Sequence, residues 1–237
     1  MRRLIHLIIV FISIAIYGCG ITEHSSKYSF TEGYYSSNLT GKENKKYYVV
    51  TGSDSIKVYP GNVRRQPADT VKSLTVLFPP HIRPKNFSPK TFRSHNFDLD
   101  VITVLFKYRP RVKDYPAQLN TNFNGAIYAG YRKDSYILSY TNSPLRVANR
   151  KISHRAFSIG GFAGLGSARI DEFVTLHRID YEYDGVVFTP GIATELALNK
   201  INFVILSGLD FLTDRNSRFW VNDKKIWIGI GVGLNLN

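Results

Sequence analysis

The sequence predicts an all-β protein in which an eight-stranded antiparallel β-barrel, residues 96–237, follows a small β module. Three features predict this fold class: apolar residues alternate with small or polar ones, short turns separate the alternating segments, and glycines gather on one face. The clearest case is the C-terminal segment KIWIGIGVGLNLN, residues 225–237. Isoleucine, valine and leucine occupy one face of this segment, and Trp227, three glycines and two asparagines occupy the other. A period of two residues is typical of a β-strand.

The first twenty residues, MRRLIHLIIVFISIAIYGCG, are expected to be a targeting segment. Arg2 and Arg3 form a charged start, and an apolar stretch of signal-peptide length follows. The stretch ends in IYGC, which resembles a bacterial lipobox, so residues 1–18 would be removed and Cys19 lipidated. Cys19 is the only cysteine of the chain. The alternative is a secretory signal with an incidental cysteine.

The rest of the chain divides into a tether, a module, a linker and the barrel. Residues 19–26 form the tether, and residues 27–78 form a small basic β module. Its expected strands are 28–35, 47–50, 55–59 and 74–78, and the middle two are joined by a turn that contains glycine and aspartate. Residues 79–95 are expected to be a linker that is stiff and extended, because each of its prolines fixes φ and removes a hydrogen-bond donor. The barrel follows at 96–237.

Eight strands are expected in the barrel, and their two faces differ in chemistry. In a soluble barrel the apolar face would form the core and the other face would carry water-compatible side chains. The last strand instead offers Gly229, Gly231 and Gly233 on that other face, and glycine is favoured where groups approach closely. We therefore expect a membrane β-barrel, with the apolar face toward lipid and the small face in a narrow lumen. The expected strands are about residues 97–108, 122–132, 135–141, 154–167, 173–183, 185–198, 201–213 and 224–236.

The lengths of the links indicate a topology. With the C-terminus in the periplasm, the short turn 199–200 is periplasmic, and links 109–121, 142–153 and 214–223 lie on the outer side. Short periplasmic turns and longer outer loops are typical of membrane barrels, although the outer link near residues 184–185 is tight. An even strand number places the N-terminal module in the periplasm.

Residues 96–237 resemble the small eight-stranded outer-membrane β-barrels of Gram-negative bacteria, in their glycine-rich alternating strands and in a terminal strand that would act as an assembly signal. Four runs also resemble a group of exported bacterial proteins with no assigned activity. This second resemblance implies an exported protein and leaves its function open. The runs are FKYRP (106–110), LNTNFNG (119–125), YDGVV (183–187) and WIG (227–229).

The formal net charge of +13 is concentrated toward the N-terminus. Residues 27–95 carry twelve Lys and Arg against four Asp and Glu. A basic module beside a bilayer is attracted to anionic headgroups by about 1 kcal/mol for each Lys or Arg near the surface. Outer-membrane lipids are therefore the expected partner, with a periplasmic or envelope protein as another. An export signal argues against nucleic acid, and a solvated basic surface without a dedicated partner remains the simplest alternative.

A lumen network is expected around Glu195, because burying an isolated carboxylate is very costly. Arg132 faces the lumen by parity and is the expected partner of Glu195, and three asparagines, Asn122, Asn124 and Asn202, face it too. Aromatic residues near the outer boundary are expected to form a belt at the headgroup level. They are Trp220, Trp227, Tyr181 and Tyr183.

No catalysis, metal or cofactor is expected. The histidines are scattered, and the glycine-rich run 160–166 lacks the strand-turn-helix context of a phosphate loop. The expected protein is a lipid-anchored outer-membrane barrel with a structural, accessory or binding role. One alternative is a lipoprotein-tethered, lipocalin-like soluble barrel with an apolar ligand. Another is a barrel enzyme that modifies lipid A or phospholipid, with Ser153, His154, Asp210 and Asp214 near its outer rim.

Overall fold

The computed structural model describes residues 29–39, 44–52, 54–61, 78–112, 115–145, 147–198 and 201–235. The expected signal segment, the whole tether with Cys19, and the turn 199–200 lie outside these residues. The described residues form an all-β structure built on one antiparallel sheet, as predicted. In this part of the chain, no helix is both long enough and apolar enough to cross a membrane.

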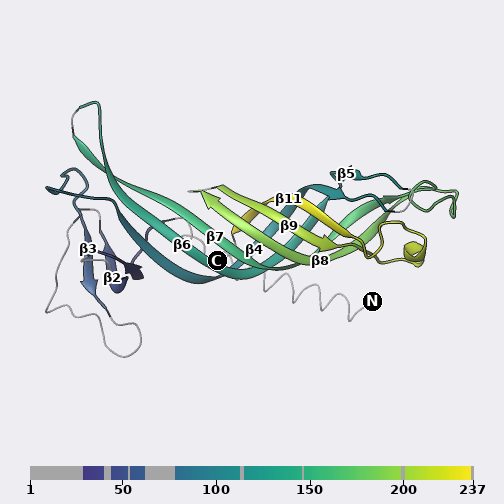
Figure 1. Cartoon of the computed structure of the whole chain (residues 1–237), viewed down its shortest axis with the longest axis horizontal. Coiled ribbons are helices and arrows are strands. Elements are labelled where there is room, and N and C mark those ends of the chain that lie inside the picture. The colour runs from purple at the N-terminus through teal and green to yellow at the C-terminus, as the bar shows by residue number, and fades with distance from the viewer. Residues whose placement is uncertain are drawn as a thin grey trace, which may run out of the picture.

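Six strands of the sheet close into a ring (Figure 1). Each strand pairs with the next along the chain, and the last, β11, pairs back onto β4 from Ile228↔Tyr108 to Asn235↔Asp100. A bulge at Leu105 interrupts this last pairing, where the register shifts between Ile230 and Gly231. The ring strands are β4 (Lys90–Arg109), β6 (Asn124–Asn142), β7 (Ala148–Ile170), β8 (Tyr183–Leu198), β9 (Ile201–Leu209) and β11 (Ile226–Asn235).

The ring has six strands where eight were predicted, for two reasons. The predicted strands 122–132 and 135–141 are one continuous strand, β6, which passes through the polar residues 133–135 without a turn. The predicted strand 173–183 is a loop, in which the Asp171 carboxylate accepts the backbone N–H groups of Phe173 and Val174 at 2.9 and 3.0 Å. Each of these two differences removes one reversal of the chain direction. The two cancel, so the last strand still runs in the expected direction.

With six strands in place of eight, the links between strands also fall at different places. The loops 110–123, 171–182 and 213–225 lie together at one end of the ring, which we call the cap end, and they contain β5 (Gln118–Asn120) and a short 3-10 helix (Arg215–Arg218). β10 (Phe211–Leu212) pairs with β8 at the same end. Link 142–153, which was expected there, lies at the opposite end. The tight outer link near 184–185 is replaced by the longer loop 171–182.

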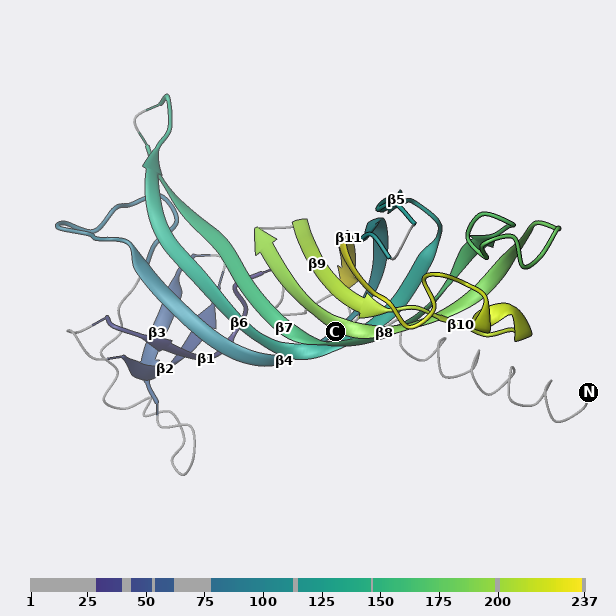
Figure 2. The ribbon, with the colours of Figure 1, turned by 45° about the vertical axis from the view of Figure 1, so that its right-hand side comes forward.

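The N-terminal module extends the same sheet. β1 (Gly33–Ser37), β2 (Lys45–Thr51) and β3 (Ile56–Pro60) are antiparallel, and β1 joins β4 through the pair Ser36↔Arg93. Figure 2 shows β4, β6 and β7 running past the ring toward these strands. The predicted linker 79–95 is therefore too long, since β4 begins at Lys90.

The module and the strand extensions share one apolar core. Phe30 packs on Tyr35, Phe92 and Tyr136, with ring centroids 4.8 to 5.3 Å apart. Tyr136 and Phe92 belong to β6 and β4, so the module packs on strands that also form the ring. The other buried members of this core are Tyr47, Val49, Ile56, Val58, Phe78 and Leu138.

Candidate functional site

Exposed apolar side chains surround the ring, and we call them the apolar belt. They come from all six ring strands and include Ile192, Phe97 and Leu165, which are 67, 65 and 59 % exposed. Soluble monomers rarely expose contiguous apolar patches larger than a few hundred Å². An exposed apolar belt around a whole ring is therefore unusual for a soluble monomer. Its members are Phe97, Phe106, Tyr108, Ile127, Tyr131, Phe157, Ile159, Leu165, Val186, Phe188, Ile192, Leu196, Leu198, Phe203, Ile205, Leu209, Ile226, Ile228, Ile230 and Val232.

Charged side chains mark the two edges of the apolar belt. His95, Lys133 and Arg155 are exposed on neighbouring strands at the module edge, and Arg169 lies opposite Asp184 at the cap edge. Between the two arginines of β7, the outward positions hold Phe, Ile, Gly, Ala, Leu and Ser. This stretch is about 46 Å of strand, or about 33 Å across a layer when tilted by roughly 45°. The hydrocarbon core of a bilayer is about 30 Å thick.

Large side chains fill the middle of the ring. Trp227 is fully buried there, and its ring centroid lies 6.0 Å from that of Phe162. Glycines make room for the indole, because a Cβ on Gly229 would lie 2.8 Å from it and a Cβ on Gly208 would lie 3.0 Å from it. The inward glycines therefore line a narrow, packed interior, as expected from their parity.

A polar region lies inside the ring toward the module. It contains Asp98, Asp100 and Glu195, which we call the acidic cluster, and one carboxylate oxygen of each lies within 4.8 Å of the others. All three residues are at most 1 % exposed. The Arg132 guanidinium lies 3.7 Å from the Asp98 carboxylate and donates to Asp134 at 3.0 Å.

A second polar region lies inside the ring toward the cap. The Lys107 ammonium donates to Asp210 and to Asn124, both at 2.8 Å, and lies 4.3 Å from the Trp227 ring centroid. Arg109 donates to the other oxygen of Asp210 at 2.5 Å. Two cations around one fully buried carboxylate form an ion-pair network. Its buried groups bind one another, which suits a structural role.

The structure divides the predicted lumen network between these two regions. Arg132 and Glu195 lie toward the module, and Asn202 is buried on the adjacent strand β9. Asn124 lies in the cap-side region, and Asn122 donates to the Ser167 carbonyl at 3.4 Å in the same part of the molecule. The direct pairing of Arg132 with Glu195 stays a prediction.

Two of the four aromatics assigned to the membrane interface are buried. Trp227 points into the ring, and Trp220 packs at 4 % exposure into the core of the cap loops. Neither indole reaches the outer surface, so their assignment to an interface belt is wrong. Tyr181 is 47 % exposed, and Tyr183 is partly buried beside it with ring centroids 5.8 Å apart.

The cap loops are tied to one another. Val221 donates its backbone N–H to the Val174 carbonyl at 3.0 Å, and the Tyr183 hydroxyl donates to Asp214 at 2.7 Å. Burial, and then the hydrogen bond to this carboxylate, raises the pKa of Tyr183, while burial raises the pKa of Tyr115. Both shifts favour the protonated phenol, the form in which Tyr183 donates to Asp214.

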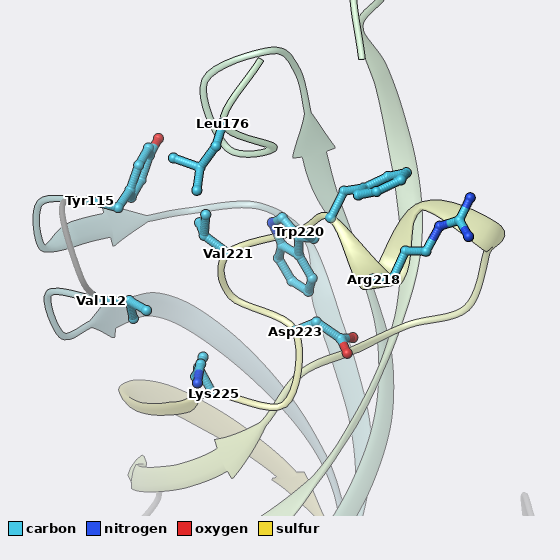
Figure 3. Close-up of a pocket in the computed structure, with 9 residues that line it drawn as sticks. Val112, Tyr115, Leu176, Arg218, Trp220, Val221, Asp223 and Lys225 are labelled. Atoms are coloured by element: carbon cyan, nitrogen blue, oxygen red, sulfur yellow. The ribbon is translucent and has the colours of Figure 1, made fainter. Parts of the chain in front are cut away.

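A cavity of about 260 Å³ opens among the cap loops (Figure 3). Tyr115, Leu176 and Val221 are grouped on one side of it, and Arg218 lies on the other. The lining mixes apolar and charged groups, which suits a small amphipathic ligand. It consists of Val112, Tyr115, Leu176, Arg218, Phe219, Trp220, Val221, Asp223 and Lys225.

The residues considered for a lipid-modifying enzyme are not brought together. Ser153 and His154 lie on the module end of β7, where His154 is buried and bonded to Asp134 at 2.7 Å. Asp210 and Asp214 lie at the cap end, where Asp210 is held by two cations and Asp214 caps the 3-10 helix. This arrangement offers no Ser-His-acid site from those four residues.

The acidic cluster was missed from the sequence, although a signal was present. Asp98 and Asp100 alternate with Phe97 and Leu99, so parity alone places both carboxylates on the inward face with Ile102. The same parity places Trp227 with the inward glycines. Parity does not predict that β8, on another side of the ring, brings Glu195 to Asp98 and Asp100.

Comparison of this chain with protein-family models, curated proteins and solved structures finds no match.

Proposed function

We propose that this protein is a lipid-anchored outer-membrane β-barrel with a structural, accessory or binding role and no catalytic activity. The observation that carries the proposal is the apolar belt, which includes residues from all six ring strands. Each exposed apolar side chain gains free energy when it leaves water, at roughly 25 cal/mol per Å² buried. A bilayer provides such surroundings on every side of a ring at once.

The charged edges support an orientation in the membrane. His95, Lys133 and Arg155 would lie at the periplasmic headgroups, together with the basic module, and Arg169 and Asp184 at the outer ones. The cap loops and their cavity would then face the outside, where a small amphipathic ligand is the expected binding partner. A lipid on Cys19 would add a second anchor from the periplasmic side.

Six strands are fewer than the eight or more of most single-chain bacterial membrane barrels, and an even number keeps every neighbouring pair antiparallel. A narrower ring has less interior volume, which fits a lining of glycines around Trp227 and Phe162. The filled interior weighs against a conducting pore.

A lipocalin-like carrier is the second candidate, and the structure weighs against it. Such a carrier needs apolar side chains around an internal ligand cavity, whereas here Ile192, Ile205 and Ile228 point outward. The middle of the interior is instead occupied by side chains of the protein itself.

Membrane extraction tests the proposal. Cells would produce the Cys19→Ala variant behind a replacement secretory signal, so that no lipid anchor holds the protein. The proposal predicts that the variant stays in the outer membrane after carbonate washing and gives a band whose mobility changes on boiling. Release into the soluble fraction would overturn membrane insertion and favour the tethered carrier.

A further inference from the structure

We propose that the acidic cluster, together with Asn202, binds one calcium ion inside the ring. The site lies toward the module, away from the cap cavity, and does not depend on whether the ring sits in a membrane. Its proposed ligands come from three strands: Asp98 and Asp100 from β4, Glu195 from β8 and Asn202 from β9.

The carboxylate geometry suits a single ion. Calcium takes oxygen ligands at about 2.3–2.6 Å, so two ligands on opposite sides of the ion are about 4.6–5.2 Å apart and all others are closer. One oxygen from each of Asp98, Asp100 and Glu195 lies within 4.8 Å of the other two. The three oxygens therefore fit around one ion.

Asn202 gives an independent indication of a ligand. Its side chain is 4 % exposed, and neither its amide oxygen nor its amide nitrogen has a hydrogen-bond partner among the described residues. Buried amides are normally hydrogen-bonded, and one left without a partner costs about 1–3 kcal/mol. An amide oxygen is also an ordinary calcium ligand. A bound ion explains why an amide occupies this position.

The strand register brings Asn202 to the cluster. Asn202 pairs with Ala197 of β8, and Glu195 lies two residues away on the same inward face. On the other side, the pair Val232↔Phe203 sets Gly233 next to Asn202. A Cβ on Gly233 would lie 3.3 Å from a Glu195 oxygen and 3.7 Å from an Asp100 oxygen, so the glycine leaves room where these groups meet.

Charge and ligand type favour calcium over other metals. The acidic cluster places three buried carboxylates in one region, with the Arg132 guanidinium 3.7 Å from Asp98. A divalent cation lowers the repulsion among them. The proposed ligands are all oxygens, whereas zinc prefers sulfur and nitrogen, and magnesium keeps several waters that a buried site holds poorly.

The test uses the full chain purified in detergent, freed of metal with EDTA and titrated with CaCl₂ in a calorimeter. We expect one calcium ion per chain and a thermal midpoint that rises by roughly 5–10 °C at 100 times the Kd. Magnesium chloride is expected to bind at least 10-fold more weakly. Absence of saturable calcium binding, with equal midpoints in calcium and in EDTA, would overturn the site, and tighter magnesium binding would overturn its assignment to calcium.

Isosteric variants show whether the buried carboxylates bind calcium or only repel one another. Asp100→Asn and Glu195→Gln are each expected to weaken calcium binding at least 10-fold and to remove the calcium-dependent rise, while Asn202→Ala weakens binding less. In EDTA both charge-removing variants are expected to melt higher than the wild type, because a buried like charge is gone. Asp184→Asn, on the outer surface, is the control and should bind calcium normally. Normal calcium binding by the Asp100→Asn and Glu195→Gln variants would overturn the proposal.

Discussion

Strands β4, β6 and β7 carry polar residues on their outer face beside the module and apolar residues on the same face within the ring. On β6, the outward positions change from Ile127 and Tyr131 to Lys133, Ser135 and Thr141 within one strand. The neighbouring strands change near the same level. On β4 the change falls between His95 and Phe97, and on β7 between Arg155 and Phe157. A boundary that crosses three neighbouring strands is what the proposed passage from water into a membrane would require.

The interior changes in the opposite sense. Toward the module the inward side chains are Phe92, Tyr136 and Leu138, which pack as an ordinary apolar core. Within the ring the inward set includes Arg132 and the carboxylates of the acidic cluster. The module therefore has the polarity of a soluble sheet, whereas the ring resembles a soluble sheet turned inside out, which is what a lipid solvent requires.

Removal of an aromatic side chain from the core of the module should destabilise the protein most. Phe92→Ala should lower the free energy of unfolding by about 3–5 kcal/mol, because Phe92 is fully buried against Phe30 and Phe78. Phe97→Ala removes the same ring from an outward position of the same strand, 65 % exposed, and should cost much less. Urea titrations of both variants in the same detergent give the comparison, and equal losses would contradict the assignment of inside and outside.

A charge in the apolar belt is the next largest perturbation. Ile192→Arg should lower stability in liposomes by roughly 2–4 kcal/mol, because the arginine would face hydrocarbon. Thr141→Arg places the same side chain on an outward position of β6 beyond the belt and should change stability by less than about 0.5 kcal/mol. If both arginines prove equally harmless, the belt faces water.

Glycines on the two faces of the ring should respond differently. Gly229→Val overpacks the interior, since a Cβ there would lie 2.8 Å from the Trp227 ring and from the Phe106 carbonyl oxygen. A loss of about 1–3 kcal/mol is expected, with a weaker heat-modifiable band on gels. The outward Gly161, whose Cβ would come no nearer than 3.7 Å to the Gly191 oxygen, is the matched control. A stable Gly229→Val variant would argue against the packed interior.

The smallest effect belongs to the cap edge. Arg169 donates to Glu182 at 2.7 Å, and both side chains are more than half exposed. Glu182→Gln should therefore cost at most about 1 kcal/mol, and less in high salt, because water and ions screen the pair. Unfolding in low and high salt measures this, and a large effect independent of salt would place the cap edge in a buried environment.

The sequence predicts the orientation of the strands well, because parity along a strand is local. The alternation from Ile226 to Val232 gives the outward face without knowledge of the partner strands. Trp227 lies on the same face of the strand as Gly229, so parity alone predicts that it is buried. Its assignment to an aromatic belt ignored this parity.

Strand number and the acidic cluster depend on distant residues. Lys133, Asp134 and Ser135 look like a turn from composition alone. Asp134 is accommodated in mid-strand because Arg132, two residues earlier on β6, and His154, across the sheet on β7, both bind it. The segment 171–182 has enough apolar residues for a strand, yet the side chain of Asp171 folds it into turns. The continuity of β6 depends on its neighbour β7, and the acidic cluster depends on closure of the ring, which brings β4 and β8 together; local patterns encode neither.

Spin labels at single cysteines distinguish an apolar belt that faces lipid from one that faces water. Cys19→Ala, behind a replacement signal, leaves no other cysteine, so a label can be placed at 192 or 205 in the apolar belt and at 91 or 141 beyond it. Collision with oxygen and with a water-soluble nickel chelate is then measured in lipid vesicles. If the belt faces lipid, collision with oxygen dominates at 192 and 205, and collision with nickel dominates at 91 and 141. Strong nickel collision at all four positions would show that the belt faces water.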